Sequence, residues 1–233
     1  MMIRIDKTGS VYDTPKLFSR SAKSNQKMKN LVWITSCYIL MIGLASSVLG
    51  QPIQSRAADV IEKLNAALVE SMKSGDELGF SGRYRLLEPV IKNSFDFKYI
   101  IKKVTGKYWK DMDENQRKVL LSNYTVWTIS KYAQRFHQYK GQRFEVVSET
   151  EFRPQVMSVK SNLIKANKEI IEFRYFMLEN NGSWRVIDIQ VSGVSQLAMN
   201  RAQFTQVLKD EGFDGLNEGL KEKIKELSSI EKD

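Results

Sequence analysis

The stretch from Asn181 to Leu220 constrains the fold more than any other, because a strand pattern in it runs directly into a helix pattern. A turn sequence, Asn-Asn-Gly at residues 180–182, opens it. Three pairs of alternating residues then follow the period of a β-strand: Trp184 and Arg185, Val186 and Ile187, Asp188 and Ile189. Beyond Gly193, apolar residues recur at helical spacing: Val194, Leu197, Phe204 and Leu208. We therefore predict a sheet that continues straight into a helix.

Three more strand-like segments precede this one. Runs rich in Val, Ile and Phe, separated by short polar turns, cover residues 143–152, 155–166, 169–179 and 183–192. In the third run, Glu172 and Arg174 alternate with large apolar residues, so we expect one face of this strand to be buried and the other to be partly exposed to solvent. The apolar set is Ile171, Phe173, Tyr175 and Met177. The pattern predicts four antiparallel strands.

The part of the chain before residue 140 is helical in pattern. Apolar spacing predicts one helix over residues 57–72, after which Gly75 and Gly79 interrupt the pattern. A shorter helix over residues 84–91 follows, and Pro89 breaks or kinks it. A third helix begins at Asp96, a suitable N-cap, and ends at Gly106. A last amphipathic helix covers residues 216–227.

The longest predicted helix runs from Glu114 to about Tyr139. Asp113 and Gln116 have the spacing of a capping box at its start. Apolar residues surround most of its circumference, whereas an ordinary surface helix buries one stripe. This helix must therefore be covered on several sides, either between a sheet and other helices or as the wall of an apolar cavity.

Helices, then a sheet, then helices is the order of an α+β layer fold. We predict helices packed on one face of a four-stranded, mainly antiparallel twisted sheet, with an apolar cavity between the layers. The sequence leaves open whether the two apolar layers close on each other or part around a ligand.

The N-terminal residues have the order of an export signal. Residues 1–30 carry seven Lys or Arg against two Asp, and residues 31–50 are mostly apolar and end in small residues. Cleavage would leave a single exported domain, residues 51–233. Alternatively, residues 31–50 stay as a membrane anchor, because about 20 apolar residues can span a bilayer. Without residues 1–50 the formal net charge falls from +9 to +4, which gives little support for nucleic-acid binding.

Few residues in this chain can perform catalytic or metal chemistry. The one cysteine, Cys37, lies within the apolar run, and the one histidine, His137, lies near a helix end, where we interpret it as solvated. These two residues cannot form a zinc site or a disulfide, and no phosphate-binding glycine loop is present. Asp111 and Asp113 imitate the start of a calcium loop, but Gln116 stands where that loop needs glycine. We predict no metal, no cofactor and no enzymatic activity.

Asp188 is the one acid inside an apolar strand, where a carboxylate is costly unless it has partners. We interpret it as structural, bonded to backbone or paired with a base such as Arg201. The alternative is a general base in a cone-shaped enzyme pocket.

Several short motifs lie in a characteristic order along the chain. The motifs are L-x-P followed by F-D-F at 95–97, T-G-K-Y-W-K at 105–110, E-N-Q-R at 114–117, W-x-V-x-D at 184–188, and S-G-V-S, R-x-Q-F and E-G-F-D-G-L after it. Their order and spacing resemble the MlaC family of periplasmic phospholipid-binding proteins, and the resemblance extends from about residue 57 to 228. The long basic segment before the apolar run departs from the family pattern, which leaves open whether the protein is released from the membrane.

The resemblance implies a monomeric carrier that holds the acyl chains of a phospholipid, or of a hopanoid-type lipid, between sheet and helices with the headgroup outside. The implied partners are an inner-membrane ABC transporter with an MCE-domain ring and an outer-membrane lipoprotein complex. The other class that remains is a membrane-anchored scaffold or assembly protein with a closed core. The residues predicted to line the lipid pocket are Phe97, Ile101, Trp127, Phe136, Ile171, Phe173, Tyr175, Val186 and Val194.

Overall fold

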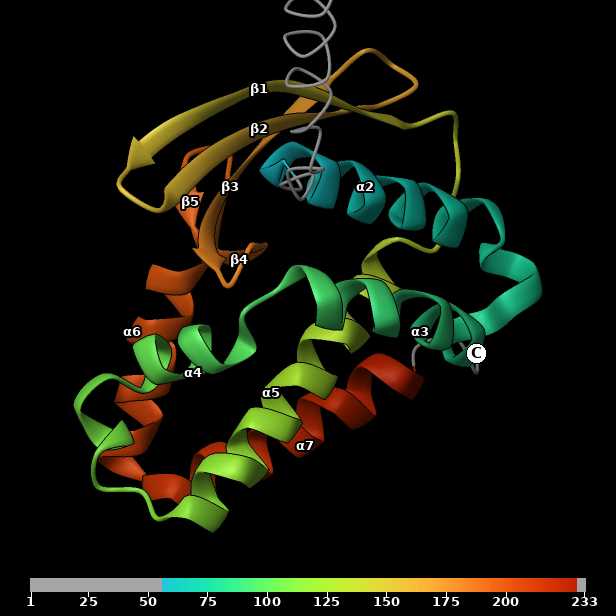
Figure 1. Ribbon diagram of the computed structural model, residues 1–233. Coiled ribbons are helices and arrows are strands. Elements are labelled where there is room, and N and C mark those ends of the chain that lie inside the picture. The colour runs from blue at the N-terminus through green and yellow to red at the C-terminus, as the bar shows by residue number, and fades with distance from the viewer. Residues whose placement is uncertain (1–55, 230–233) are drawn as a thin grey trace, which may run out of the picture. The chain divides into compact units, whose positions relative to one another are not determined.

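Five antiparallel strands form the sheet, in the order β1-β2-β3-β4-β5 (Figure 1). The computed structural model describes residues 56–229, so the predicted signal peptide, residues 1–50, lies outside them. The strands are β1 (Arg143–Arg153), β2 (Val156–Ile164), β3 (Ile170–Asn180), β4 (Ser183–Val191) and β5 (Val194–Ser195). Each strand pairs with the next in sequence, as an up-and-down meander does.

The prediction of four strands was wrong by one, at the point where the sheet meets the helix. Ser192 and Gly193 both have positive φ angles, 49° and 84°, which suits a tight two-residue hairpin turn. The chain therefore folds back and pairs Val194 with Val191 before a helix begins. Val194, predicted as helical, lies in β5 and is 51% exposed.

Six α-helices and one short 3₁₀ helix accompany the sheet in the described part of the chain. They are α2 (Ala57–Lys73), α3 (Gly75–Ser94), α4 (Phe97–Thr105), η1 (Gly106–Trp109), α5 (Glu114–Arg135), α6 (Gln196–Asp210) and α7 (Gly212–Ser229). The sheet forms a layer over α2, and α5 lies farther from the outer strands, packed against α3, α4 and α7 (Figure 1). This is an α+β arrangement, and α5 is covered on several sides as its composition predicted.

Local signals at two helix starts are confirmed. The Asp96 carboxylate accepts a hydrogen bond from the Tyr99 N–H at 2.8 Å, and Asp113 and Gln116 form the predicted capping box. Two other predictions need correction. The non-helical residue in α3 is Gly79 (φ 57°) and not Pro89. The helix α5 ends at Arg135 and not near Tyr139.

The early end of α5 has a packing cause. Phe136 leaves helical geometry (φ −105°, ψ 59°), and its ring stacks on Tyr132 with the centroids 5.7 Å apart. Only 5% of Phe136 stays exposed, so its ring is buried in the core. Tertiary packing outweighs the helical pattern that continues in the sequence.

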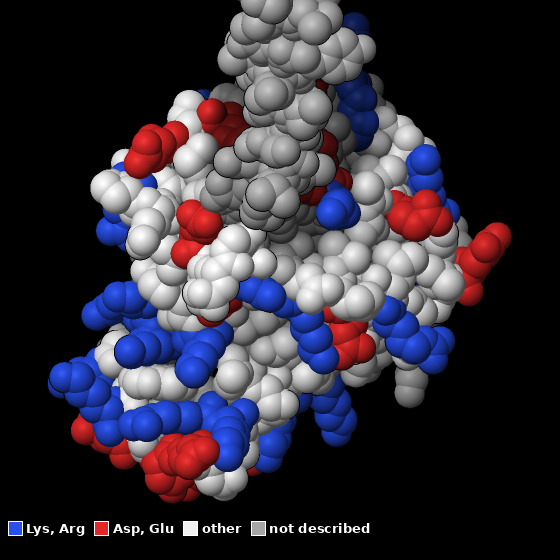
Figure 2. All heavy atoms as spheres, in the orientation of Figure 1, with Lys and Arg blue, Asp and Glu red and all other residues white. Residues whose placement is uncertain are grey.

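Lysine side chains gather on one part of the surface. Figure 2 shows basic residues clustered where α4, η1 and the start of α5 lie. The exposed members that we call the basic surface are Lys98, Lys102, Lys103, Lys107 and Lys110. Within residues 56–229, none of the five forms an ion pair. The basic surface therefore keeps its charge free for a partner.

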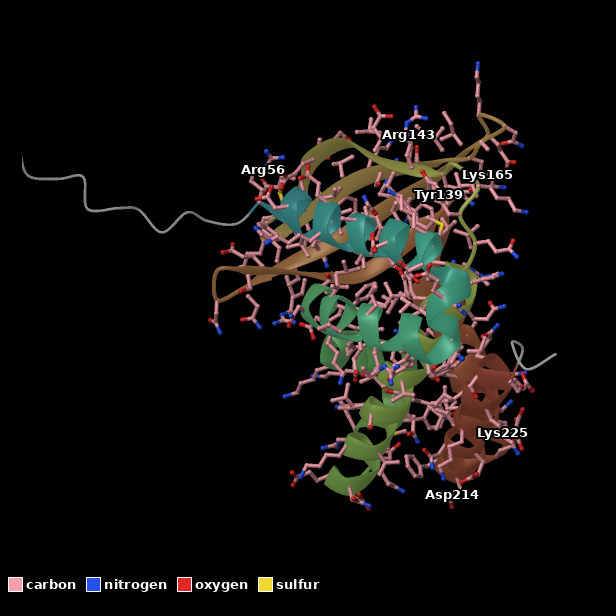
Figure 3. The ribbon with its side chains drawn as sticks, turned by 90° about the vertical axis from the view of Figure 1, so that its right-hand side faces the viewer. Arg56, Tyr139, Arg143, Lys165, Asp214 and Lys225 are labelled. Carbon is pink, nitrogen blue, oxygen red and sulfur yellow. The ribbon has the colours of Figure 1, made fainter. Side chains whose placement is uncertain are left out.

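The turn between α2 and α3 packs directly on the C-terminal end of α5, and we call this contact the α2–α5 junction. It consists of Ser71, Gly75 and Arg83 on one side and Ala133, Phe136 and His137 on the other. Next to it, the Lys73 ammonium lies 5.5 Å from the centroid of the Tyr139 ring. Figure 3 shows Tyr139 near the end of α2, below Arg143 at the start of β1. The junction fixes where α5 ends relative to α2.

Candidate functional site

A pocket of about 230 Å³ lies between α5, the sheet and α6. The helix α5 and the residue after it contribute Tyr124, Trp127, Thr128, Lys131, Tyr132, Arg135 and Phe136. The sheet contributes Phe173, Val186, Ile187, Asp188, Ile189 and Val191. The helix α6 contributes Gln196, Leu197, Asn200 and Gln203, and Phe95, Phe97 and Ile100 come from the α4 region.

The pocket lining changes from polar to apolar with depth. Arg135 and Gln203 are exposed, so they lie at the mouth. Phe95 and Val186 line the pocket and are 5% and 0% exposed, so they lie at its floor. Such a gradient suits a ligand with an apolar end inside and a polar end at the surface.

A connected set of aromatic rings makes much of the wall. Phe95 stacks on Phe97 with centroids 5.6 Å apart, and it meets Tyr132 edge-on at 6.0 Å. On the side of α6, the rings of Tyr124 and Trp127 both contact Phe204. Aromatic pairs at these distances add to the stability given by burial alone. The wall is therefore apolar and held by contacts from several elements.

The structure brings together only part of the predicted lipid-binding set. The residues of that set that line the pocket are Phe97, Trp127, Phe136, Phe173 and Val186. Ile101 and Tyr175 are 0% and 1% exposed and belong to the closed core, and Ile171 packs against that core from its edge. Val194 faces outward on β5. Contact of any of these residues with lipid stays a prediction.

Asp188 is bonded to the start of α6. Its Oδ2 accepts a hydrogen bond from the Ser195 hydroxyl at 2.7 Å, and its Oδ1 accepts one from the Leu197 N–H at 2.9 Å. Arg201 is not among its hydrogen-bonding partners within residues 56–229. Both oxygens therefore fix the first turn of α6. This agrees with the interpretation of Asp188 as a structural residue bonded to backbone, but the suggested pairing with Arg201 is absent from the described residues.

Lys131 is the unusual charge of the pocket. Its ammonium lies 3.4 Å from the centroid of the Trp127 ring, one helical turn earlier on α5. Burial, together with the smaller effect of the nearby Arg135 charge, lowers the pKa of Lys131 from 10.5 to about 8. The Lys131 side chain is partly buried: protein surrounds most of it, and the surface that stays accessible faces the pocket.

Neither cation of the pocket has an acidic partner. Within the described residues, Lys131 and Arg135 form no ion pair. The pocket's one carboxylate, Asp188, is engaged at α6. Its other titratable groups are the hydroxyls of Tyr124 and Tyr132, and burial raises the pKa of Tyr124 to about 12 and raises that of Tyr132 as well. Near pH 7 the two tyrosines are neutral, so they do not compensate the cations.

We expect Lys131→Met to raise the free energy of unfolding of the ligand-free protein by about 2 kcal/mol at pH 7. A lowering of the pKa from 10.5 to about 8 corresponds to roughly 3 kcal/mol, and the lost contact with the Trp127 ring offsets about 1 kcal/mol. Between pH 8 and 10.5 the unfolded chain binds more protons at Lys131 than the folded protein does. Wild-type stability therefore rises over this window, and the advantage of the variant shrinks. Urea unfolding at neutral pH and at about pH 9.5, below the ionisation of unfolded tyrosines, measures both effects.

Lys118 provides a matched control on the same helix. It is exposed and pairs with Glu114 at 2.7 Å, so Lys118→Met should change stability by less than about 1 kcal/mol at either pH. A Lys131→Met protein less stable than wild type would mean that the contacts of the ammonium outweigh the cost of its burial.

Sequence reasoning did not select Lys131, Arg135, Phe95 or the α6 amides. Helical periodicity assigns a lysine to a solvated face by default, so Lys131 was passed over. The available signal was its position: Lys131 lies four residues after Trp127 in a helix whose circumference is mostly apolar, so little solvated face was left for it.

No group of three metal-binding side chains comes together within residues 56–229. In the same part of the chain, no helix has the length and hydrophobicity that crossing a bilayer requires. The predicted anchor, residues 31–50, lies outside this range.

Comparisons with known proteins agree with the architecture. The model of the MlaC protein family matches residues 62–222. The intermembrane phospholipid transport system binding protein MlaC of Haemophilus influenzae is 26% identical over 138 residues, which are 56% of this chain and 64% of that protein. The chain thus matches just under two thirds of that relative's length. A solved structure, the phospholipid-binding protein from Ralstonia solanacearum in complex with a phospholipid, is 20% identical with a TM-score of 0.67. The match covers 75% of this chain and 99% of the Ralstonia solanacearum chain, and at this identity the likeness shows the fold alone.

Proposed function

We propose that this chain, which belongs to the MlaC family, is a non-enzymatic lipid carrier that holds phospholipid acyl chains in the pocket between α5, the sheet and α6. The observation that carries the proposal is the polar-to-apolar gradient of the pocket, with Arg135 and Gln203 at the mouth and Phe95 and Val186 at the floor. The names of the two relatives support phospholipid as the cargo.

The pocket must widen to hold a whole phospholipid. Its volume of about 230 Å³ is below the roughly 300–1,000 Å³ typical of pockets for drug-sized ligands. Each buried methylene contributes about 0.8 kcal/mol relative to water, which favours separating the layers around the acyl chains. A bilayer offers nearly the same free energy, so transfer is close to balanced, and partners must set its direction.

Native mass spectrometry of protein purified without detergent tests the carrier. We expect a bound phospholipid at near-stoichiometric amounts, and the lipid extracted from the sample should carry two acyl chains. Protein that is lipid-free, folded and unable to take up added phospholipid would contradict the proposal.

We propose that the protein works in the periplasm, released by cleavage of residues 1–50, and exchanges lipid with an inner-membrane MCE-domain ABC transporter and an outer-membrane lipoprotein complex. Family membership is the support for these partners. N-terminal sequencing of the exported protein separates this carrier from a membrane-anchored scaffold, in which residues 31–50 would be kept.

The basic surface fits a transient contact with such a partner. Contacts between exposed charges are screened as salt rises, and the screening length falls to about 3 Å at about 1 M salt. We expect partner binding to weaken over this range, and Lys102→Glu with Lys107→Glu to weaken it at low salt. Surface plasmon resonance with the isolated MCE ring measures both effects.

Lys221→Glu is the control for this surface. Lys221 lies on α7, which carries none of the five lysines of the basic surface, and it pairs with Glu218 at 2.7 Å. A charge reversal there should change partner binding little. If Lys221→Glu weakens binding as much as the two substitutions on α4 and η1, then net charge and not the basic surface governs the contact.

A further inference from the structure

The pocket holds a positive charge for which the protein supplies no counter-charge. Lys131 and Arg135 lie one turn apart on α5 and both line the pocket. Neither forms an ion pair within residues 56–229, and the carboxylate of Asp188 is bonded to Ser195 and to the backbone of α6. A mostly apolar pocket would be more stable without an unpaired ammonium. Natural proteins often place a residue that lowers stability at a binding site.

The Trp127 ring holds the ammonium in place without neutralising it. A cation over an aromatic face is attracted by the ring but keeps its full charge and its N–H donors. The opposite wall, from α6, contributes the uncharged residues Gln196, Asn200 and Gln203. The ammonium is thus directed at the pocket with donors available between the mouth and the apolar floor.

We infer that Lys131, assisted by Arg135 at the mouth, binds the phosphodiester of the cargo lipid and makes the carrier selective for phosphate-bearing lipids. This inference rests on the proposed function. The phosphate would lie at the polar end of the gradient, with the acyl chains toward Phe95 and Val186 and the rest of the headgroup beyond the mouth. A phosphate oxygen accepts charge-assisted hydrogen bonds from lysine and arginine, and these are stronger than neutral ones.

A cycle that varies the lipid and the lysine tests this inference. The probes are dioctanoyl phosphatidylglycerol and dioctanoylglycerol, which share their acyl chains and differ in the phosphoglycerol headgroup that carries the charge. We expect Lys131→Met to weaken phosphatidylglycerol binding about ten- to a hundred-fold and dioctanoylglycerol binding less than about threefold. Arg135→Gln should have a smaller effect, because an exposed cation is screened by salt. Titration calorimetry measures the affinities.

The control variant is Lys118→Met on the same helix, which should leave both affinities unchanged. Equal losses for the two lipids with Lys131→Met, or no loss for either, would overturn the inference and leave the carrier in place. If neither lipid binds the wild-type protein, the carrier itself fails, and the inference with it.

Inorganic phosphate in the millimolar range distinguishes a lipid phosphate from a free anion. We expect it to displace little phosphatidylglycerol, because it gains nothing from the apolar floor. Tight competition by inorganic phosphate would overturn the assignment to lipid and indicate a simple anion site.

Discussion

Replacing Gly75 by alanine is expected to lower the free energy of unfolding by about 3–5 kcal/mol and the melting temperature by about 10 °C. A Cβ at Gly75 would lie 1.8 Å from the carbonyl oxygen of His137 and 2.8 Å from its carbonyl carbon. Both atoms belong to the backbone, so no side-chain rotation relieves the overlap. Alanine is the better helix former, but this gain in helix propensity is worth only about 1 kcal/mol, and the overlap outweighs it.

The overlap would also disturb the hydrogen bonds of the α2–α5 junction. Arg83, which is 1% exposed, donates to the carbonyl oxygens of Gly75 and Ala133, each at 2.8 Å. The Ser71 hydroxyl donates to the Phe136 carbonyl oxygen at 2.9 Å. If the two segments separate, these buried carbonyls lose their donors, at a cost of about 1–3 kcal/mol each.

Gly219 is the matched control for Gly75. It lies in α7, and a Cβ there would meet no atom within 4 Å. Gly219→Ala should therefore stabilise the protein by about 0.5–1 kcal/mol. Thermal and urea unfolding of both variants measures the contrast. A Gly75→Ala protein within about 1 kcal/mol of wild type would mean that the α2–α3 turn shifts away from His137 at little cost.

The junction also bears on the pocket, because it positions the end of α5 that carries Lys131 and Arg135. We expect Gly75→Ala to lower phospholipid retention even at temperatures where the protein is folded. Gly219→Ala should retain lipid like the wild type.

Local sequence signals predicted the parts of this fold that depend on neighbouring residues. The turn at Asn181 and Gly182, both with positive φ, was visible from the residue types alone, as was the Asp96 cap. Contacts between distant segments were not visible. The interpretation of His137 as a solvated histidine missed that its carbonyl packs on Gly75, 62 positions earlier in the chain.

The same limit applies to the pocket. Alternation places Phe173 and Tyr175 on one face of β3, but it does not say which part of that face lies under closely packed helices. In the structure Phe173 lines the pocket, whereas Tyr175 is 1% exposed in the closed core. Two residues with one sequence signature thus have different surroundings, because the docking of α5 decides where the layers part.

This difference predicts opposite responses to one substitution. We expect Phe173→Asp to remain folded but to lose most of its phospholipid, since water in the emptied pocket can hydrate the new carboxylate. Lys131 and Arg135 face the same pocket and further favour a negative charge there. The cost to folding should be about 1–2 kcal/mol. Binding of the acyl chains would weaken, because they would remove the water that hydrates the carboxylate.

Tyr175→Asp should instead unfold the protein. Tyr175 is buried among closely packed residues, and a charge there without a partner costs about 3–5 kcal/mol, in addition to the lost burial of the ring. Circular dichroism with urea unfolding reports the fold, and native mass spectrometry reports bound lipid. If both variants unfold, Phe173 belongs to ordinary core. If Phe173→Asp keeps wild-type lipid content, then the acyl chains lie elsewhere and the pocket between α5, the sheet and α6 is not the carrier site.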